Sequence, residues 1–137
     1  MANAKSYKLY MHEYTTQPFD LVNNEQYTFH KLYIDGECQI DSFLEAIENS
    51  SDKSEKNALA RIIGNMSIIS DRIKLPKTKF RHIEISERND VFEFKHDTLR
   101  IYVMFQRPDM FVVFGGFKKN QKKDIKNIAR RVAEFRK

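Results

Sequence analysis

The sequence predicts an α+β fold, in which a small antiparallel β-sheet, mixed at its edge, carries two N-terminal helices and one C-terminal helix. Two patterns predict it. Apolar residues alternate with a period of two near the start of the chain and again between residues 80 and 114, and they recur at helical spacing in between and after residue 124. A length of 137 residues fits one domain over 1–137, with an N-terminal strand extension at 1–35 and a core at 36–137.

The N-terminal extension is expected to form two strands joined by a loop. Residues 7–12 alternate as a half-buried strand does. Gln17-Pro18 interrupts this pattern, and aromatic and β-branched residues concentrate again at 27–34. Asp35-Gly36 is a turn pair, which predicts the end of the second strand.

Two helices are predicted next. Ser42 and Glu45 have the spacing of a capping box, so Asp41 or Ser42 is the expected cap of the first helix. The second helix is expected to begin near Asp52 or Ser54. The predicted apolar faces are Ile40, Phe43, Leu44 and Ile47 in the first helix, and Leu59, Ile62, Ile63, Met66 and Ile69 in the second.

Four strands and a helix are expected to complete the chain. The strands are predicted at 80–85, 91–95, 99–106 and 110–114. A turn at Arg107-Pro108-Asp109 joins the last two, because proline removes no ladder hydrogen bond there. The helix is predicted over 124–135, and its buried face is expected to contain Ile125, Ile128, Ala129, Val132 and Phe135.

Strand alternation also predicts which side chains share a face of the sheet. Phe92 and Phe94 are expected to face the core, so that Glu93 and Lys95 face the other way. A short loop at 96–98 then pairs Lys95 with Arg100 and Glu93 with Tyr102. The outward-facing residues of the second strand are expected to be Arg100, Tyr102, Met104 and Gln106.

The pairing of Lys95 with Arg100 sets like charges opposite each other, which destabilises a sheet. Either solvent screens the two charges or an anion binds between them. Positive charge concentrates nearby, since residues 115–137 carry nine Lys or Arg and two acidic residues, whereas residues 1–114 sum to −2. A solvated basic face is one interpretation of this asymmetry, and nucleic-acid binding is the other.

Single-stranded RNA suits this arrangement. Lys95, Arg100, Lys118 and Lys119 are predicted to surround a groove in which cations hold phosphates. The Tyr102 ring is expected to stack on a base there. Cations of the last helix are expected to add general attraction to RNA: Lys122, Lys123, Lys126, Arg130 and Arg131.

Several classes of protein are excluded by what the sequence lacks. The single cysteine, Cys38, allows no intramolecular disulfide, and no apolar leader or membrane-spanning run is present, so a cytoplasmic protein is expected. Nucleotide-binding and metalloprotease motifs are missing, and the four histidines have no metal-ligand spacing with Cys38. We therefore expect no metal, no small-molecule cofactor and no membrane partner.

Three segments carry a resemblance to a known family: Phe43-Leu44, the 91–95 strand with the following 99–102, and residues 116–119 before the last helix. With them, residues 43–136 resemble the RelE/ParE superfamily of type II toxin–antitoxin toxins, and are most similar to its HigB-like, phage-derived branch. The resemblance implies a RelE-like fold and an mRNA interferase, a ribosome-dependent endoribonuclease that inhibits translation. It also implies an antitoxin partner, and metal-independent attack of the ribose 2′-OH on the adjacent phosphate.

The resemblance assigns catalytic roles to residues of the sheet. Arg100 matches the strand arginine that holds the scissile phosphate, and Lys95 matches a basic position at the end of the preceding strand. Lys118 and Lys119 match the basic pair after the last strand. His96 is the candidate acid or base, by proximity alone.

Other positions depart from the family pattern. Glu93 lies where some relatives carry lysine and HigB-like ones often carry glutamate, and the tyrosine of some relatives falls near Ile125. Residues 1–30 exceed the minimal family domain. Two alternatives to the nuclease remain: a ParE-like toxin that inhibits DNA gyrase, and a non-catalytic basic module that binds nucleic acid.

Overall fold

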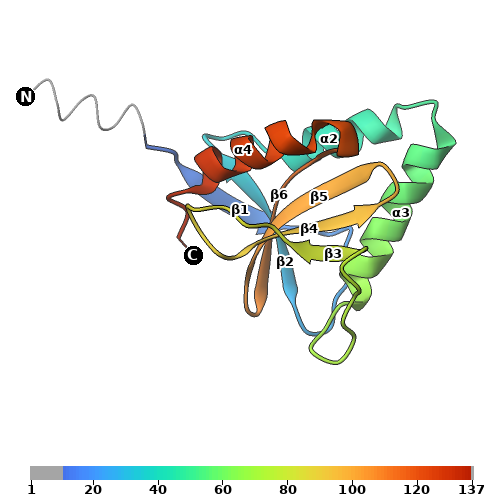
Figure 1. Ribbon diagram of the computed structural model, residues 1–137, viewed down its shortest axis with the longest axis horizontal. Coiled ribbons are helices and arrows are strands. Elements are labelled where there is room, and N and C mark those ends of the chain that lie inside the picture. Colours follow the sequence, from blue (N-terminus) through green and yellow to red (C-terminus); the bar gives the residue numbers. More distant parts are fainter. Residues whose placement is uncertain (1–10, 137) are drawn as a thin grey trace, which may run out of the picture.

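The computed structural model describes residues 11–136, in which six strands and three α-helices are joined by turns (Figure 1). The strand predicted at 7–12 lies outside the described residues except for Met11 and His12, which belong to no strand. In chain order the elements are β1 (Tyr14–Pro18), β2 (Thr28–Ile34), α2 (Gln39–Glu48), α3 (Lys53–Ile68), β3 (Phe80–His82), β4 (Val91–His96), β5 (Leu99–Gln106), β6 (Asp109–Phe117), a 3-10 turn (Lys118–Asn120) and α4 (Gln121–Val132).

The six strands form one mixed sheet in the order β1-β2-β6-β5-β4-β3. All neighbouring strands are antiparallel except β2 and β6, which run parallel. The chain between these two strands contains α2, α3 and the β3-β4-β5 meander, as a parallel pair requires a long connection. The predicted α+β class is confirmed, and the sheet is mixed. Its parallel pair, however, does not include an edge strand as predicted, because β1 pairs with β2 on the outer side.

The predicted register of β4 and β5 is also confirmed, with Lys95 opposite Arg100 and Glu93 opposite Tyr102. The turn between the strands is shorter than predicted, because His96 pairs with Leu99 and only two residues lie between them. Asp97 in this turn has a φ of 53°. Two-residue hairpin turns need that left-handed conformation, and aspartate adopts it more readily than most residues.

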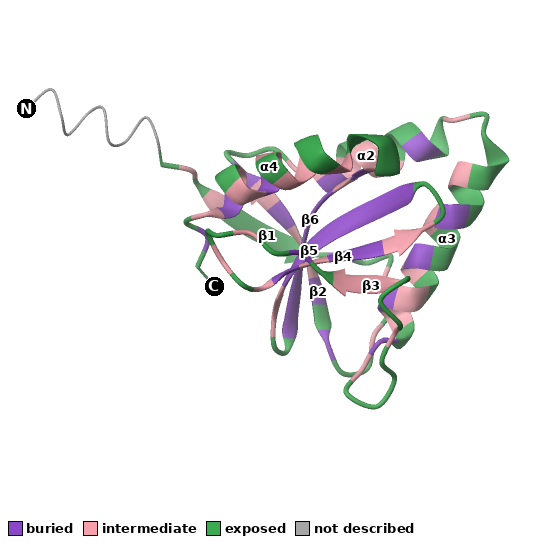
Figure 2. Cartoon of the chain, in the orientation of Figure 1, coloured by how far each residue is buried: buried purple, intermediate pink, exposed green. Residues whose placement is uncertain are grey.

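Helices cover both faces of the sheet. On one face, Ile40 of α2 and Ile62 of α3 pack in a core with Phe94 and Ile101. On the other face, α4 packs Ile128 and Val132 in a second core with Tyr102 and Met104. As a result β5 is buried over most of its length, while much of the visible surface of α4 is exposed (Figure 2).

The prediction that one side of β5 faces solvent is therefore wrong. Tyr102 and Met104 are 0% exposed and Arg100 is 5% exposed; Gln106 is half-buried. The cause is α4, whose apolar stripe would remain in water if it did not cover this side of the sheet. The predicted stripe itself is confirmed at its centre and end, where Ile128, Val132 and Phe135 are buried.

The two preceding helices begin differently. α3 is capped by Asp52 as predicted, because Asp52 Oδ1 accepts a hydrogen bond from the backbone N–H of Ser54 at 2.8 Å. The predicted cap of α2 at Asp41 or Ser42 is wrong, since that helix already begins at Gln39 and its first residue follows Cys38. Asp41 instead accepts a hydrogen bond from Lys31 Nζ of β2 at 2.9 Å.

The other boundaries differ by a few residues. β3 ends at His82 rather than at 85, although the Ile83 N–H still donates to the Val91 carbonyl at 2.8 Å. β6 extends to Phe117, beyond the predicted 114, and α4 begins at Gln121, before the predicted 124. The sheet therefore continues up to the 3-10 turn that carries Lys118 and Lys119.

Candidate functional site

Four cations from four elements converge on the α4-covered face of the sheet: Arg81 of β3, Lys95 of β4, Arg100 of β5 and Lys118 of the 3-10 turn. We call them the cation cluster. Lys95 is at its centre, opposite Arg100 across the β4-β5 ladder and within electrostatic range of the other three cations. Three of the four lie on neighbouring strands, so the sheet itself fixes their spacing.

Arg100 is held by the turn beside it. Its Nη1 donates to the backbone carbonyls of Asp97 and Leu99, both at 2.8 Å. Its buried Nε has no hydrogen-bond partner in the described part of the chain. An unpaired buried donor costs stability, and because this N–H is buried, Arg100 acts on the surface through its positive charge.

The negative charge of Glu93 offsets part of the repulsion among the four cations. Glu93 is 0% exposed, and its carboxylate pairs with Arg81 Nη2 at 2.8 Å. Gln121 Nε2, in the first turn of α4, donates to the same carboxylate at 2.8 Å. A buried carboxylate with a charged partner and an amide donor is well satisfied. Glu93 thus holds Arg81 beside Lys95 and ties β4 to the beginning of α4.

Lys95 is a half-buried residue, and burial lowers the pKa of its ammonium group. Repulsion from Arg81, Arg100 and Lys118 lowers that pKa further, while Glu93 opposes the shift. A lysine with a lowered pKa exchanges protons more readily near neutral pH than an ordinary lysine does. Lys95 is therefore a candidate proton-transfer group that lies among three other cations.

Tyr102 and Asp124 lie beneath the first turns of α4. Burial raises the pKa of the Tyr102 hydroxyl, and the charges of Glu93 and Asp124 raise it further. The ring packs against Phe114 with centroids 5.1 Å apart. Because no part of Tyr102 reaches the surface, the predicted stacking of its ring on an RNA base is wrong for this conformation.

Asp124 is a polar residue inside the same layer. Its Oδ2 has no hydrogen-bond partner within residues 11–136. It lies over Gly116, where the Cβ of any other residue would overlap it. Burial raises the pKa of this carboxyl, and the positive charge of Lys123 partly offsets that rise.

The structure separates His96 from the cation cluster. Alternation along β4 turns His96 toward α3, whereas Lys95 faces α4. His96 Nδ1 lies 2.7 Å from Lys79 Nζ. Burial lowers its pKa, and Lys79 and Arg61 add to that shift. The proximity on which His96 was predicted is therefore proximity along the chain only, because its side chain lies on the other face of the sheet from the cation cluster.

The lysine pair also divides between the two sides. Lys118 is close enough to Lys95 to lower its pKa. Lys119 Nζ instead lies 6.0 Å from the centroid of the Phe117 ring, which packs with the α2–α3 core. Both lysines are exposed, as predicted. Lys118 therefore belongs to the cation cluster and Lys119 extends it around the end of β6.

The predicted RNA-attracting cations of α4 are mostly on its outer surface. Lys122, Lys123, Lys126 and Arg130 are exposed. Arg131 is half-buried. Its backbone carbonyl accepts a hydrogen bond from the Tyr14 hydroxyl at 2.6 Å. The four exposed residues make α4 a basic ridge beside the cation cluster.

Sequence reasoning missed Arg81, Gln121 and Asp124. Arg81 lies directly opposite Glu93 in the β3-β4 ladder, so its role would follow from that register. The irregular connection at 83–90 hides the register from the sequence. Gln121 and Asp124 have no signal of their own, because the predicted helix began at 124 and its packing onto β4 and β6 is a tertiary contact.

The described part of the chain shows no metal centre, and comparison with known proteins does not identify the site. Within the described residues, no three His, Cys, Asp or Glu side chains gather as metal ligands do. The described helices include none that is long and apolar enough to cross a membrane. Comparison of the chain with models of protein families, with curated proteins and with solved structures finds no match in any of the three.

Proposed function

We propose that this chain is the RelE-like toxin of a type II toxin–antitoxin system and acts in the cytoplasm as a ribosome-dependent mRNA endoribonuclease. One observation carries the proposal: Lys95, with its lowered pKa, stands among Arg81, Arg100 and Lys118 at one end of the sheet. Such a cluster binds a phosphate and offers a proton-transfer group beside it. The sheet flanked by helices is also compatible with the compact sheet and flanking helices that the resemblance implies.

The proposed reaction needs only groups of the chain and of the RNA. The ribose 2′-oxygen attacks the adjacent phosphorus, the bond from phosphorus to the 5′-oxygen breaks, and a 2′,3′-cyclic phosphate and a 5′-hydroxyl result. Lys95 accepts the 2′-hydroxyl proton, and solvent protonates the departing 5′-oxygen. Arg81 and Lys118 bind the non-bridging oxygens, while buried Arg100 adds positive potential from inside the fold.

Expression in cells followed by mapping of mRNA 5′ ends tests the proposal. We expect new ends at codon positions of translated messages, and their loss with Lys95→Ala. The matched control is Lys56→Ala, which removes an exposed lysine from α3 on the other face of the sheet and is expected to leave cleavage unchanged. Intact mRNA together with DNA damage would instead favour a gyrase inhibitor, and salt-sensitive RNA binding without new ends would favour a non-catalytic module.

A further inference from the structure

Arg81 and Glu93 form an unusual ion pair at the edge of the sheet. They are directly opposite in the β3-β4 ladder, and β3 is an edge strand of three residues. The guanidinium of Arg81 approaches a single oxygen of the carboxylate, with Nη2 at 2.8 Å and Nε at 3.1 Å from Glu93 Oε1. Arginine frequently binds a carboxylate through two parallel hydrogen bonds, one to each oxygen. Here the second oxygen is left to another partner.

That partner is Gln121, the first residue of α4. Its Nε2 donates to Glu93 Oε2 at 2.8 Å and lies 3.1 Å from Oε1. Because Glu93 is fully buried, each of its oxygens needs a donor, and an unpaired buried acceptor is costly. The amide of Gln121 therefore occupies the place that a second hydrogen bond from Arg81 would take.

This arrangement leaves one end of Arg81 available. Its Nη1 has no hydrogen-bond partner among the described residues, and its side chain is 42% exposed. After burial, repulsion from Arg81 is the largest cause of the lowered pKa of Lys95, so the two cations lie close together. A phosphate bound beside Lys95 is thus within reach of a guanidinium that still has donors to offer.

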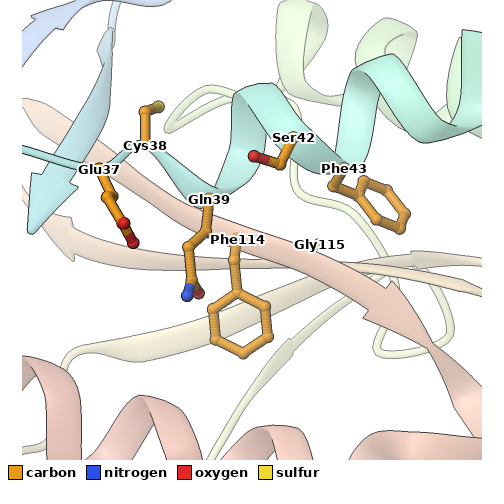
Figure 3. Close-up of a pocket in the computed structure, with 7 residues that line it drawn as sticks. All are labelled: Glu37, Cys38, Gln39, Ser42, Phe43, Phe114 and Gly115. Carbon is orange, nitrogen blue, oxygen red and sulfur yellow. The ribbon is translucent and has the colours of Figure 1, made fainter.

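The hollow on the α2 side of β6 offers no comparable place for a phosphate. It has a volume of about 630 Å³, and the residues that line it are shown in Figure 3. The described residues of this lining include no lysine or arginine and one acidic residue, Glu37. Since phosphate binding depends on cations, the orientation of Arg81 in the cation cluster decides how well a phosphate is held.

We propose that Gln121 is a positioning residue of the cation cluster, which holds Oε2 of Glu93 and thereby keeps Arg81 on Oε1 with Nη1 available to a phosphate. Without the amide of Gln121, the Nε and Nη2 groups of Arg81 are expected to bind both carboxylate oxygens, which turns the guanidinium. The inference rests on the proposed function and adds the residue that sets the geometry of its phosphate site.

Side-chain NMR of the full chain tests this geometry without RNA. Gln121→Met keeps the length of the side chain and removes the donor. We expect rotation of the Arg81 guanidinium about its Nε–Cζ bond to be slower in this variant, because two oxygens hold it. Backbone amide signals far from β3, β4 and α4 should stay unchanged and show that the variant is folded. Unchanged or faster rotation would overturn the proposal.

Gln17→Met is the matched control. It makes the same change at an exposed position of β1, which is the opposite edge strand of the sheet. Rotation of the Arg81 guanidinium is expected to be the same in this variant as in the wild type.

Binding of a single-stranded RNA with 2′-O-methyl groups tests the consequence, because such RNA has no 2′-OH to attack the phosphate. We expect Arg81→Met and Gln121→Met each to weaken binding about tenfold, the effect of losing one hydrogen bond to a charged group. The double variant is expected to bind no more weakly than Arg81→Met alone, because Gln121 acts through Arg81. Additive losses would overturn the positioning role.

Failure of this inference and failure of the proposed function give different results. A wild-type chain that binds the methylated RNA but produces no new mRNA ends contradicts the nuclease and leaves the role of Gln121 intact. A wild-type chain that cleaves mRNA, together with additive losses in the two variants, contradicts the role of Gln121 alone. A wild-type chain that does not bind the RNA contradicts both.

Discussion

Lys95 and His96 are neighbours in β4, yet the sheet sends their side chains to opposite faces. Each has a pKa lowered by burial and by nearby cations, but only Lys95 stands beside Arg81, Arg100 and Lys118. A perturbed pKa therefore does not by itself select a catalytic group. The position within the cation cluster does, and it favours Lys95 for the proposed reaction.

Lys95→Arg separates proton transfer from charge, because arginine keeps the positive charge and does not lose its proton in this range. In single-turnover cleavage on programmed ribosomes, we expect the wild-type rate to rise with pH and level off below the ordinary lysine pKa. The sign follows from the lowered pKa of Lys95, since the neutral amine that accepts the proton forms at lower pH. The variant is expected to lose this rise and about 100-fold or more in rate.

His96→Gln is the control, and it is expected to retain the pH profile of the wild type. A Lys95→Arg variant that keeps the rise with pH would show that another group transfers the proton.

The two glycines at the end of β6 are predicted to be intolerant of alanine for different reasons. At Gly115 the added Cβ meets the ring of Phe43, which packs against Phe117, and at Gly116 it meets Asp124 Oδ2. Urea unfolding is expected to show losses of about 1–3 kcal/mol for each variant. Asp124→Ala is expected to restore Gly116→Ala and not Gly115→Ala.

Gly64→Ala is the contrasting case within helix α3. Nothing lies within 4 Å of its Cβ position. Alanine is favoured over glycine in a helix interior, so a gain of about 0.5–1 kcal/mol is expected. A loss of stability at Gly64 would contradict the packing described here.

At the scale of whole elements, α4 determines what this protein can present to a ligand. Its first turn binds Glu93 through Gln121, and its apolar stripe buries Tyr102 and Met104. Its far end is held by Arg88, whose Nη1 donates to the carbonyls of Val132 at 2.6 Å and Phe135 at 2.9 Å. The helix is thus fixed at both ends by strands and loops remote in sequence.

Arg88→Met tests how strongly this end is held. The change leaves carbonyls at the end of α4 without their donor and Asp90 without its charged partner, so a loss of about 1–3 kcal/mol is expected at neutral pH. Burial raises the pKa of Asp90, but the hydrogen bonds from Arg88 and Gln106 outweigh it and leave the pKa lowered. The Asp90 contribution is therefore present at neutral pH and is lost as pH falls through that lowered pKa.

Urea unfolding at pH 7 and at pH 3 measures both effects. The difference between wild type and Arg88→Met is expected to shrink at the lower pH. Arg72→Met, at an exposed position, serves as the control and should change stability little at either pH.

At the scale of the whole molecule, the formal charge of +5 is distributed unevenly. Lys122, Lys123, Lys126 and Arg130 line the exposed side of α4, next to the cation cluster at its N-terminal end. Under the proposed function, long-range attraction to RNA and positioning of a phosphate would belong to adjacent but separate surfaces.

Replacing Lys122, Lys123 and Lys126 by glutamine tests this division. Binding to single-stranded RNA is expected to weaken, and the slope of log affinity against log salt to fall by about 0.7 for each phosphate that the variant no longer neutralises. Glutamine at Lys56, Lys74 and Lys77 removes the same charge elsewhere and is expected to leave the slope nearer the wild-type value. Equal slopes for the two triple variants would show that α4 is not the RNA-attracting surface.

The sequence by itself determined the α+β class, the β4-β5 register and the start of α3 near Asp52 or Ser54. Each of these depends on residues close together in the chain: a period of two or 3.6, a short turn, or a side chain bonding to N–H groups two or three residues away. The predicted Asp41 or Ser42 cap shows the limit of such local signals. The capping-box spacing is present, but the helix already begins at Gln39, and its second residue, Ile40, is fully buried in the core.

Only the tertiary structure decided which face of the sheet is open and which residues share the site. Alternation placed Arg100 and Tyr102 on one face, but it could not show that α4 covers that face. The contacts of Glu93 with Gln121, and of Arg88 with the end of α4, join residues that are 28 to 47 positions apart. Such contacts follow from how the apolar faces pack together, and no local pattern encodes them.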